Sequence, residues 1–174
     1  MGKLKDLDYK LFWELIKDSR RSDRQLAKNL KSSQPTITRK RTRLEKEIIE
    51  GYTAVPKWNK IGFELVAFTF VKSRTRYGKD KERQKALQAT KEWFMSQPNV
   101  ILAISGQGMG WDGVSISMHK NYSDYMDFLR RHDMALSDYI KESQSFIADI
   151  NPGLIMKDFH FKYLAETNAK DEKQ

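Results

Sequence analysis

The period of the hydrophobic pattern changes once along this 174-residue chain, near Phe63. Before that point, apolar residues recur every three or four positions, as on one face of an α-helix. After it, segments with the alternating pattern of β-strands are separated by helical segments. The chain is 39% hydrophobic, which is enough for a packed core. We therefore predict an α+β protein built from two parts.

The first part is predicted to contain three helices. Leu4, Leu7, Leu11 and Leu15 mark a first helix over about 8–18. Two later segments carry start signals for a helix. One is the capping-box pair Ser22 and Gln25, which opens a short helix ending near Lys31. The other is Ser33 or Gln34 as a cap, with Pro35 in the first turn of the third helix. The β-rich segment 50–56 (EGYTAVP) is predicted to be an extended wing or linker strand.

The second part reads as strand, helix, strand, strand, helix, strand. The strands are expected at 63–73, 99–105, 111–120, 145–150 and 154–164, the last two closing the sheet, and the helices at 78–98 and 122–143. This order is the ferredoxin-like βαββαβ motif, in which two helices cover one face of an antiparallel sheet. The predicted organisation is a helical domain over 1–55, a linker over 56–62, a second domain over 63–164 and a disordered polar tail over 165–174.

Positive charge is concentrated in the first third of the chain. The formal net charge is +9, and residues 1–62 hold 16 Lys and Arg against 8 Asp and Glu. The other 112 residues are close to neutral. Such asymmetry predicts a polyanionic partner for the helical part.

Two short helices joined by a tight turn, the second of them basic, form the pattern of a helix-turn-helix. The spacing i, i+3, i+4, i+7 puts Thr36, Arg39, Lys40 and Arg43 on one helix face. Gln34 and Thr36 are predicted to reach base edges, and the arginines guanine or phosphate. The predicted DNA-binding residues are Gln34, Thr36, Arg39, Lys40 and Arg43, with Arg20, Arg21 and Arg24 as phosphate contacts. The alternative is that these cations form an ordinary solvated face.

The chain resembles the leucine-responsive/asparagine-regulator (Lrp/AsnC) family of bacterial and archaeal transcription regulators. The resemblance is carried by Leu26-Ala27, Arg43-Leu44-Glu45 and Gly51-Tyr52-Thr53-Ala54, followed by the βαββαβ segment. The chain departs from the family pattern in three places. Lys31 stands where the family has Gly in the turn, and Arg41 stands where it has an apolar residue. The Gly that usually follows the third helix is absent before Ile48.

The resemblance implies a winged helix-turn-helix joined to a ferredoxin-like dimerisation and effector domain. It implies a regulator that binds double-stranded DNA as a homodimer or higher homo-oligomer. No cofactor is expected, and a cytoplasmic protein is expected because the N-terminal segment MGKLKDLDYK lacks the apolar region of a secretory signal. Family members bind small effectors, often amino acids, near the turn between the second and third strands. Gly110, Trp111 and Asp112 match the end of that turn, although GQGMGWD is longer than usual.

Other functions find less support in the residues. The glycines at 106, 108 and 110 lack the Lys-Ser/Thr and the helix of a phosphate-binding loop. His119, His132 and His160 lack metal-ligand spacing, and the chain has no cysteine and no membrane-length apolar run. Two alternatives stay open. One is an enzyme similar to the sirohaem decarboxylases, with His119 as the candidate residue. The other is a DNA-packing protein that senses no effector.

Overall fold

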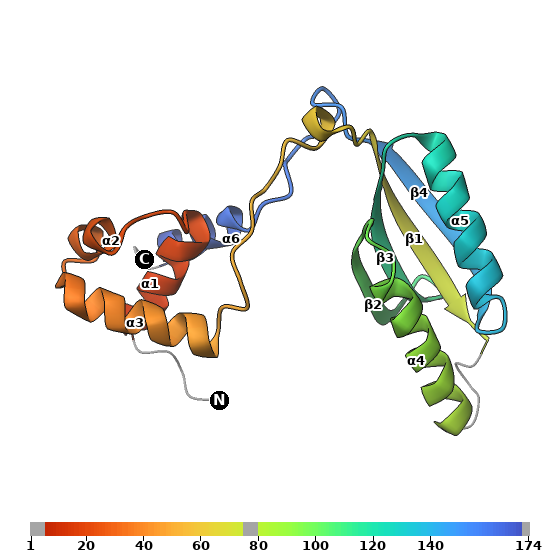
Figure 1. Ribbon diagram of the computed structural model, residues 1–174, viewed down its shortest axis with the longest axis horizontal. Coiled ribbons are helices and arrows are strands. Elements are labelled where there is room, and N and C mark those ends of the chain that lie inside the picture. The colour runs from red at the N-terminus through yellow and green to blue at the C-terminus, as the bar shows by residue number, and fades with distance from the viewer. Residues whose placement is uncertain (1–5, 75–79, 172–174) are drawn as a thin grey trace. The chain divides into compact units, whose positions relative to one another are not determined.

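The chain divides into two compact units, each described here by itself. The computed structural model describes residues 6–74 and 80–171, with side chains as far as Glu166. The first unit joins residues 1–55 to residues 157–174, and the second comprises residues 56–156 (Figure 1).

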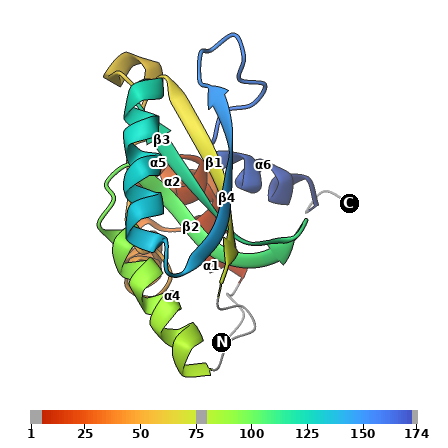
Figure 2. The ribbon, with the colours of Figure 1, turned by 90° about the vertical axis from the view of Figure 1, so that its right-hand side faces the viewer.

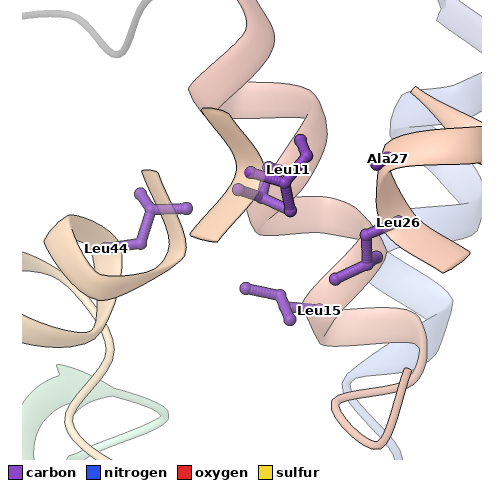
Figure 3. Close-up of a cluster of buried hydrophobic side chains, with 6 residues drawn as sticks. Leu11, Leu15, Leu26, Ala27 and Leu44 are labelled. Atoms are coloured by element: carbon purple, nitrogen blue, oxygen red, sulfur yellow. The ribbon is translucent and has the colours of Figure 1, made fainter. Parts of the chain in front are cut away.

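Three helices form the centre of the first unit. They are α1 (Asp6–Lys17), α2 (Asp23–Asn29) and α3 (Gln34–Glu47). The predicted apolar stripe of the first helix is confirmed at Leu11 and Leu15, while Leu4 lies outside the described residues. The core is shown in Figure 3, and it consists of Leu11, Leu15, Leu26, Ala27, Ile37 and Leu44.

The start signals of α2 and α3 act as predicted. The Ser22 hydroxyl accepts a hydrogen bond from the Gln25 backbone N–H, and the Gln25 side chain accepts one from the Ser22 N–H over 2.9 Å. Ser33 caps α3 by accepting from the Thr36 N–H, and Pro35 sits in the first turn. Each cap satisfies backbone donors that a helix start leaves without partners.

The segment after α3 has no regular secondary structure over 50–57, including the predicted wing or linker strand. The expected linker contains a short 3-10 helix, η1 (Trp58–Ile61), which ends at Gly62 with a left-handed φ of 87°.

The end of the chain differs from the prediction. Residues expected to form a last strand over 154–164 and a disordered tail over 165–174 instead include α6 (Lys162–Asp171), which packs against α1. Ala165 is completely buried there. The polar composition concealed this contact, because one small apolar residue is enough to let two helices approach closely. Residues 172–174 lie outside the described part of the chain.

The second unit has the predicted ferredoxin-like order. Its elements are β1 (Leu65–Ser73), α4 (Asp80–Met95), β2 (Val100–Gly108), β3 (Trp111–His119), α5 (Tyr122–Leu136) and β4 (Ile140–Asp149). The strands form one antiparallel sheet in the order β2-β3-β1-β4. Two bounds differ from the expectation. The first two residues of the predicted 78–98 helix lie outside the described residues, and residues 140–143 belong to β4 because Ile140 pairs with Ser73 of β1.

Both helices of this unit lie on the same face of the sheet (Figure 2). The residues buried beneath them include Ala67, Thr69, Ser115, Ser117 and His119. On the opposite face, the strand register places a row of apolar side chains together: Phe68, Phe70, Leu102, Ile104, Val114, Ile116 and Phe146. Within the described residues, no helix of the unit covers this second face, which we call the open sheet face.

Candidate nucleic-acid interface

The turn that leads into α3 takes an uncommon backbone conformation. Lys31, where the sequence pattern led us to expect Gly, has a φ of +50°. The left-handed region favours glycine because a side chain there crowds the backbone. The departure at Lys31 therefore preserves the turn but adds strain to it, and α3 still begins where the sequence predicts.

Two of the predicted DNA-binding cations on α3 are bound to one carboxylate of α1. Lys40 Nζ lies 2.8 Å from Asp8 Oδ1, and Arg43 Nη2 lies 2.6 Å from Asp8 Oδ2. The Arg43 contact is an ion pair without the angles of a good hydrogen bond, whereas Lys40 donates a hydrogen bond. Asp8 itself is completely buried. The sequence analysis missed Asp8, which stands 32 residues before Lys40.

The ionisation of Asp8 is set by two opposing effects. Burial raises the pKa of Asp8, but the Lys40 hydrogen bond and the positive charges of Lys40 and Arg43 together bring that pKa below its ordinary value. The carboxylate is therefore charged at neutral pH and compensates part of the positive charge of both cations.

Arg41 replaces an apolar contact with a polar network. Its guanidinium forms ion pairs with Asp23 (3.2 Å) and Glu45 (2.9 Å). It also donates to the backbone carbonyl oxygens of Ser19 (3.2 Å) and Arg21 (3.1 Å). Arg41 thus ties α3 to α2 and to the turn between α1 and α2, so it is a structural residue.

The exposed side of α3 is centred on Arg39. With Ile37 and Leu44 buried, the positions opposite them on a helix are Pro35, Arg39, Thr42 and Lys46, all exposed. Gln34 is also exposed, whereas Thr36 is half-buried and Lys40 mostly covered. The predicted face of Thr36, Arg39, Lys40 and Arg43 is therefore turned partly toward α1.

The arginines around the start of α2 divide into two groups. Arg21 is half-buried and forms ion pairs with Glu14 and Asp18. Arg20 and Arg24 are exposed, and in the described part of the chain neither makes an ion pair. The same holds for Lys28, Lys31, Arg39 and Lys46. These six residues, the free cations, lie on α2, α3 and the two turns before them.

Three free cations were absent from the predicted site: Lys28, Lys31 and Lys46. The spacing of Arg24 and Lys28, one helical turn apart, was the available signal for the first. No feature of the neighbouring sequence indicated that Lys46 lacks an ion pair while Lys40 forms one, because ion pairing depends on where acidic side chains lie in the fold.

The candidate effector turn is tighter than the sequence predicted. Strand β2 continues to Gly108, which pairs with Trp111, so that only Met109 and Gly110 form the turn. Both have positive φ, 50° and 81°, as a two-residue hairpin of type I′ requires. Asp112 accepts a hydrogen bond from the Ser73 backbone N–H over 2.8 Å and so holds the end of β1.

The candidate catalytic histidine is a core residue. His119 is completely buried beneath α5, in contact with the rings of Tyr125 and Phe128, and bonds the Ser117 hydroxyl at 2.8 Å. Burial lowers the pKa of His119, partly opposed by Asp124. Among the described residues, no three His, Cys, Asp or Glu side chains gather as a metal site would require. Nor does any described helix have the length and apolar character to cross a membrane.

Comparison with known sequences finds transcription regulators. No protein-family profile matches the chain. An uncharacterised HTH-type transcriptional regulator of Pyrococcus furiosus is 37% identical over 79 residues, 45% of this chain, so the match spans about half (53%) of that relative. A similarly described protein of Pyrococcus abyssi is 27% identical over 128 residues, 73% of this chain and 80% of the relative.

Solved structures with the same fold include regulators of the AsnC family. An AsnC-family regulator from Agrobacterium tumefaciens superposes with a TM-score of 0.73 at 18% identity, over 92% of this chain and 99% of the other. E. coli AsnC superposes with a TM-score of 0.66 at 20% identity, over 91% and 99%. A Neisseria meningitidis regulator in complex with L-methionine gives 0.76 at 18% identity, over 91% and 94%. The resemblance predicted from the sequence is thereby confirmed for the fold.

Proposed function

We propose that the protein is a DNA-binding transcription regulator, with the free cations and the start of α3 as its DNA surface. The observation that carries the proposal is the separation of charge in the helical unit. The acidic residues Asp8, Glu14, Asp18 and Asp23 each pair with a cation of the unit, and six other cations remain exposed and, among the described residues, without an ion pair on α2, α3 and their turns. A surface of unpaired Lys and Arg on a helix-turn-helix fits the phosphates of a duplex.

In this function, Arg39 is the best-placed residue to enter the major groove. It is exposed at the middle of the outer side of α3, while Gln34 at the helix start lies about one and a half turns before it. Gln34 can pair with an adenine edge and Arg39 with guanine or phosphate. Arg20 and Arg24, around the start of α2, then contact the phosphate backbone.

The test is the binding of a fluorescent duplex from the protein's own promoter, measured against salt with mixed-sequence competitor. Arg39→Ala is expected to lower the affinity by about 1–3 kcal/mol if Arg39 pairs with a base, and to reduce the salt slope by about one. Arg83→Ala on α4 is the matched control, since it removes an exposed cation outside the helical unit. Equal affinities for wild type, Arg39→Ala and Arg83→Ala would contradict the proposal.

The proposal includes a homodimer formed through the open sheet face. Leu102, Ile104 and Phe146 are large apolar residues exposed on that face. A second copy of the same face would remove them from water, at about 25 cal/mol for each Å² buried. Dimers would present two helix-turn-helix units to a pseudo-palindromic site, and further association of dimers is part of the proposal.

The proposal also includes a small effector, with an amino acid as the expected class. Support comes from the L-methionine bound to the Neisseria regulator of similar fold. Gly110, Trp111 and Asp112 are the proposed contacts, and Asp112 would have to share its carboxylate with the Ser73 N–H. The test is a thermal-shift series with the twenty amino acids, in which a shift seen in wild type and lost in Asp112→Asn supports the assignment.

A regulator acting on chromosomal DNA would work in the cytoplasm and need no catalytic group. The burial of His119 supports this reading over the decarboxylase alternative. Footprinting separates a regulator from a packing protein, since a regulator protects one short site and a packing protein coats the fragment evenly.

A further inference from the structure

Asp8 joins Lys40 and Arg43, two cations of α3 that the sequence analysis assigns equally to DNA. Its carboxylate comes from the first turn of α1 and is completely buried. One oxygen accepts a hydrogen bond from Lys40 at 2.8 Å, and the other lies 2.6 Å from Arg43. The side chains of Lys40 and Arg43 nevertheless differ in their exposure to solvent.

The side chain of Lys40 is 17% exposed, and that of Arg43 is 43% exposed. A lysine ammonium is a single point of charge, so the Asp8 contact withdraws Lys40 from a ligand. An arginine guanidinium is planar and carries five N–H donors, so one edge can contact Asp8 while another stays open. Arg43 is therefore held in one orientation with donors still available to a phosphate.

We propose that Asp8 is a positioning residue for DNA recognition, which removes Lys40 from the DNA surface and orients Arg43 toward a single backbone phosphate. This inference rests on the proposed function. Asp8 also reduces the positive charge that the helix offers to any duplex. It thus weakens sequence-independent attraction while it favours the one register in which the oriented Arg43 meets its phosphate.

The experiment compares Asp8→Asn with Asp6→Asn in the full-length protein. Asp6 lies on the same helix, is 78% exposed and pairs with Lys10 at the surface, so its substitution makes the same change of charge without releasing Lys40 or Arg43. Two probes are used: a mixed-sequence duplex of about 30 base pairs, three helical turns, and the duplex that wild type enriches from a random pool.

Asp8→Asn is expected to bind the mixed-sequence duplex more tightly, with a salt slope steeper by about one to two. Its preference for the enriched duplex is expected to fall at least several-fold, while Asp6→Asn keeps the wild-type preference. A merely structural role would weaken binding to both probes and leave their ratio unchanged.

The inference would be overturned if Asp8→Asn and Asp6→Asn showed the same salt slope and the same preference for the enriched duplex. The proposed function would still stand in that case, provided that the wild type binds DNA. Failure of wild type to bind either duplex would instead refute the proposed function, and this inference with it. If Asp8→Asn does not fold, the double variant Asp8→Asn/Lys40→Met removes the buried charges together. This double variant is expected to have a salt slope steeper by about one and a weaker preference for the enriched duplex. Wild-type values of both quantities would overturn the inference.

Discussion

Arg41 donates a hydrogen bond from Nη2 to the backbone carbonyl oxygen of Ser19, over 3.2 Å. This contact joins α3 to the turn that follows α1, 22 residues earlier in the chain. The same guanidinium also contacts Arg21 O in that turn, Asp23 of α2 and Glu45 of α3, so it links the turn to both helices.

We expect Arg41→Lys to destabilise the helical unit by about 1–2 kcal/mol, because lysine keeps the charge but cannot reach several acceptors with one planar group. Urea unfolding followed by circular dichroism at 222 nm measures the loss. Arg39→Lys is the control and should leave stability unchanged, since Arg39 is exposed. Equal stabilities of the two variants would show that the Arg41 network contributes little.

The left-handed turn predicts a stabilising substitution. Lys31→Gly should raise the free energy of unfolding by about 0.5–1 kcal/mol, because it relieves the strain of a positive φ but gives the unfolded chain more freedom. Lys28→Gly, inside α2, should lower it by about 1 kcal/mol. Both values come from the midpoints of thermal unfolding, and a destabilised Lys31→Gly variant would contradict the positive φ.

The helical unit should lose stability in acid. Burial raises the pKa of Asp8, but Lys40 and Arg43 lower it by more, so that the pKa lies below its ordinary 3.8. Likewise, burial raises the pKa of Glu14, but Lys17 and Arg21 bring it below its ordinary 4.5. A carboxyl with a lowered pKa stabilises the fold above its unfolded pKa and ceases to do so as pH falls through the folded pKa.

Stability from these two groups should therefore be constant above about pH 5 and decrease below about pH 4. Urea titrations between pH 2.5 and 7 measure it. Asp8→Asn should start from a lower stability at pH 7 and show a shallower decrease in acid. If the stability of Asp8→Asn fell as steeply below about pH 4 as that of the wild type, Asp8 would not be a cause of the acid destabilisation.

The open sheet face predicts a variant that does not dimerise. The Ile104 side chain lies on that face and is 56% exposed, and Ile104→Glu would place a charge in the proposed interface, where it lacks a partner. Sedimentation velocity should show a shift from dimer to monomer. Leu87→Glu alters an equally exposed residue of α4 and should remain dimeric. A dimeric Ile104→Glu would place the interface elsewhere.

The packing of α6 on α1 predicts that the end of the chain stabilises the helical unit. Ala165→Asp should lower its stability by about 1–3 kcal/mol, because the new carboxylate would be buried against α1 unless α6 detached. Hydrogen exchange of the α1 amides should accelerate accordingly. Glu166→Ala, at the exposed neighbouring position, is the control, and unchanged exchange in Ala165→Asp would mean that α6 contributes nothing to α1.

Most of the fold was predictable because its signals are local. The caps at Ser22 and Ser33, the apolar stripe of α1 and the change of period near Phe63 each depend on residues a few positions apart, and the structure confirms them. The tight Met109–Gly110 turn and the helix α6 were missed, because strand length and helix docking depend on distant partners.

The sequence by itself determined which residues are basic, that they fall on a helix-turn-helix, and that a ferredoxin-like domain follows. Only the tertiary structure decided which of those cations are free. Periodicity assigns a side chain to a face of its helix, but its charge is available to a ligand only if no acidic group lies within reach. Asp8 comes 32 residues before Lys40 in the chain and 2.8 Å from it in the fold, and no local pattern records that distance.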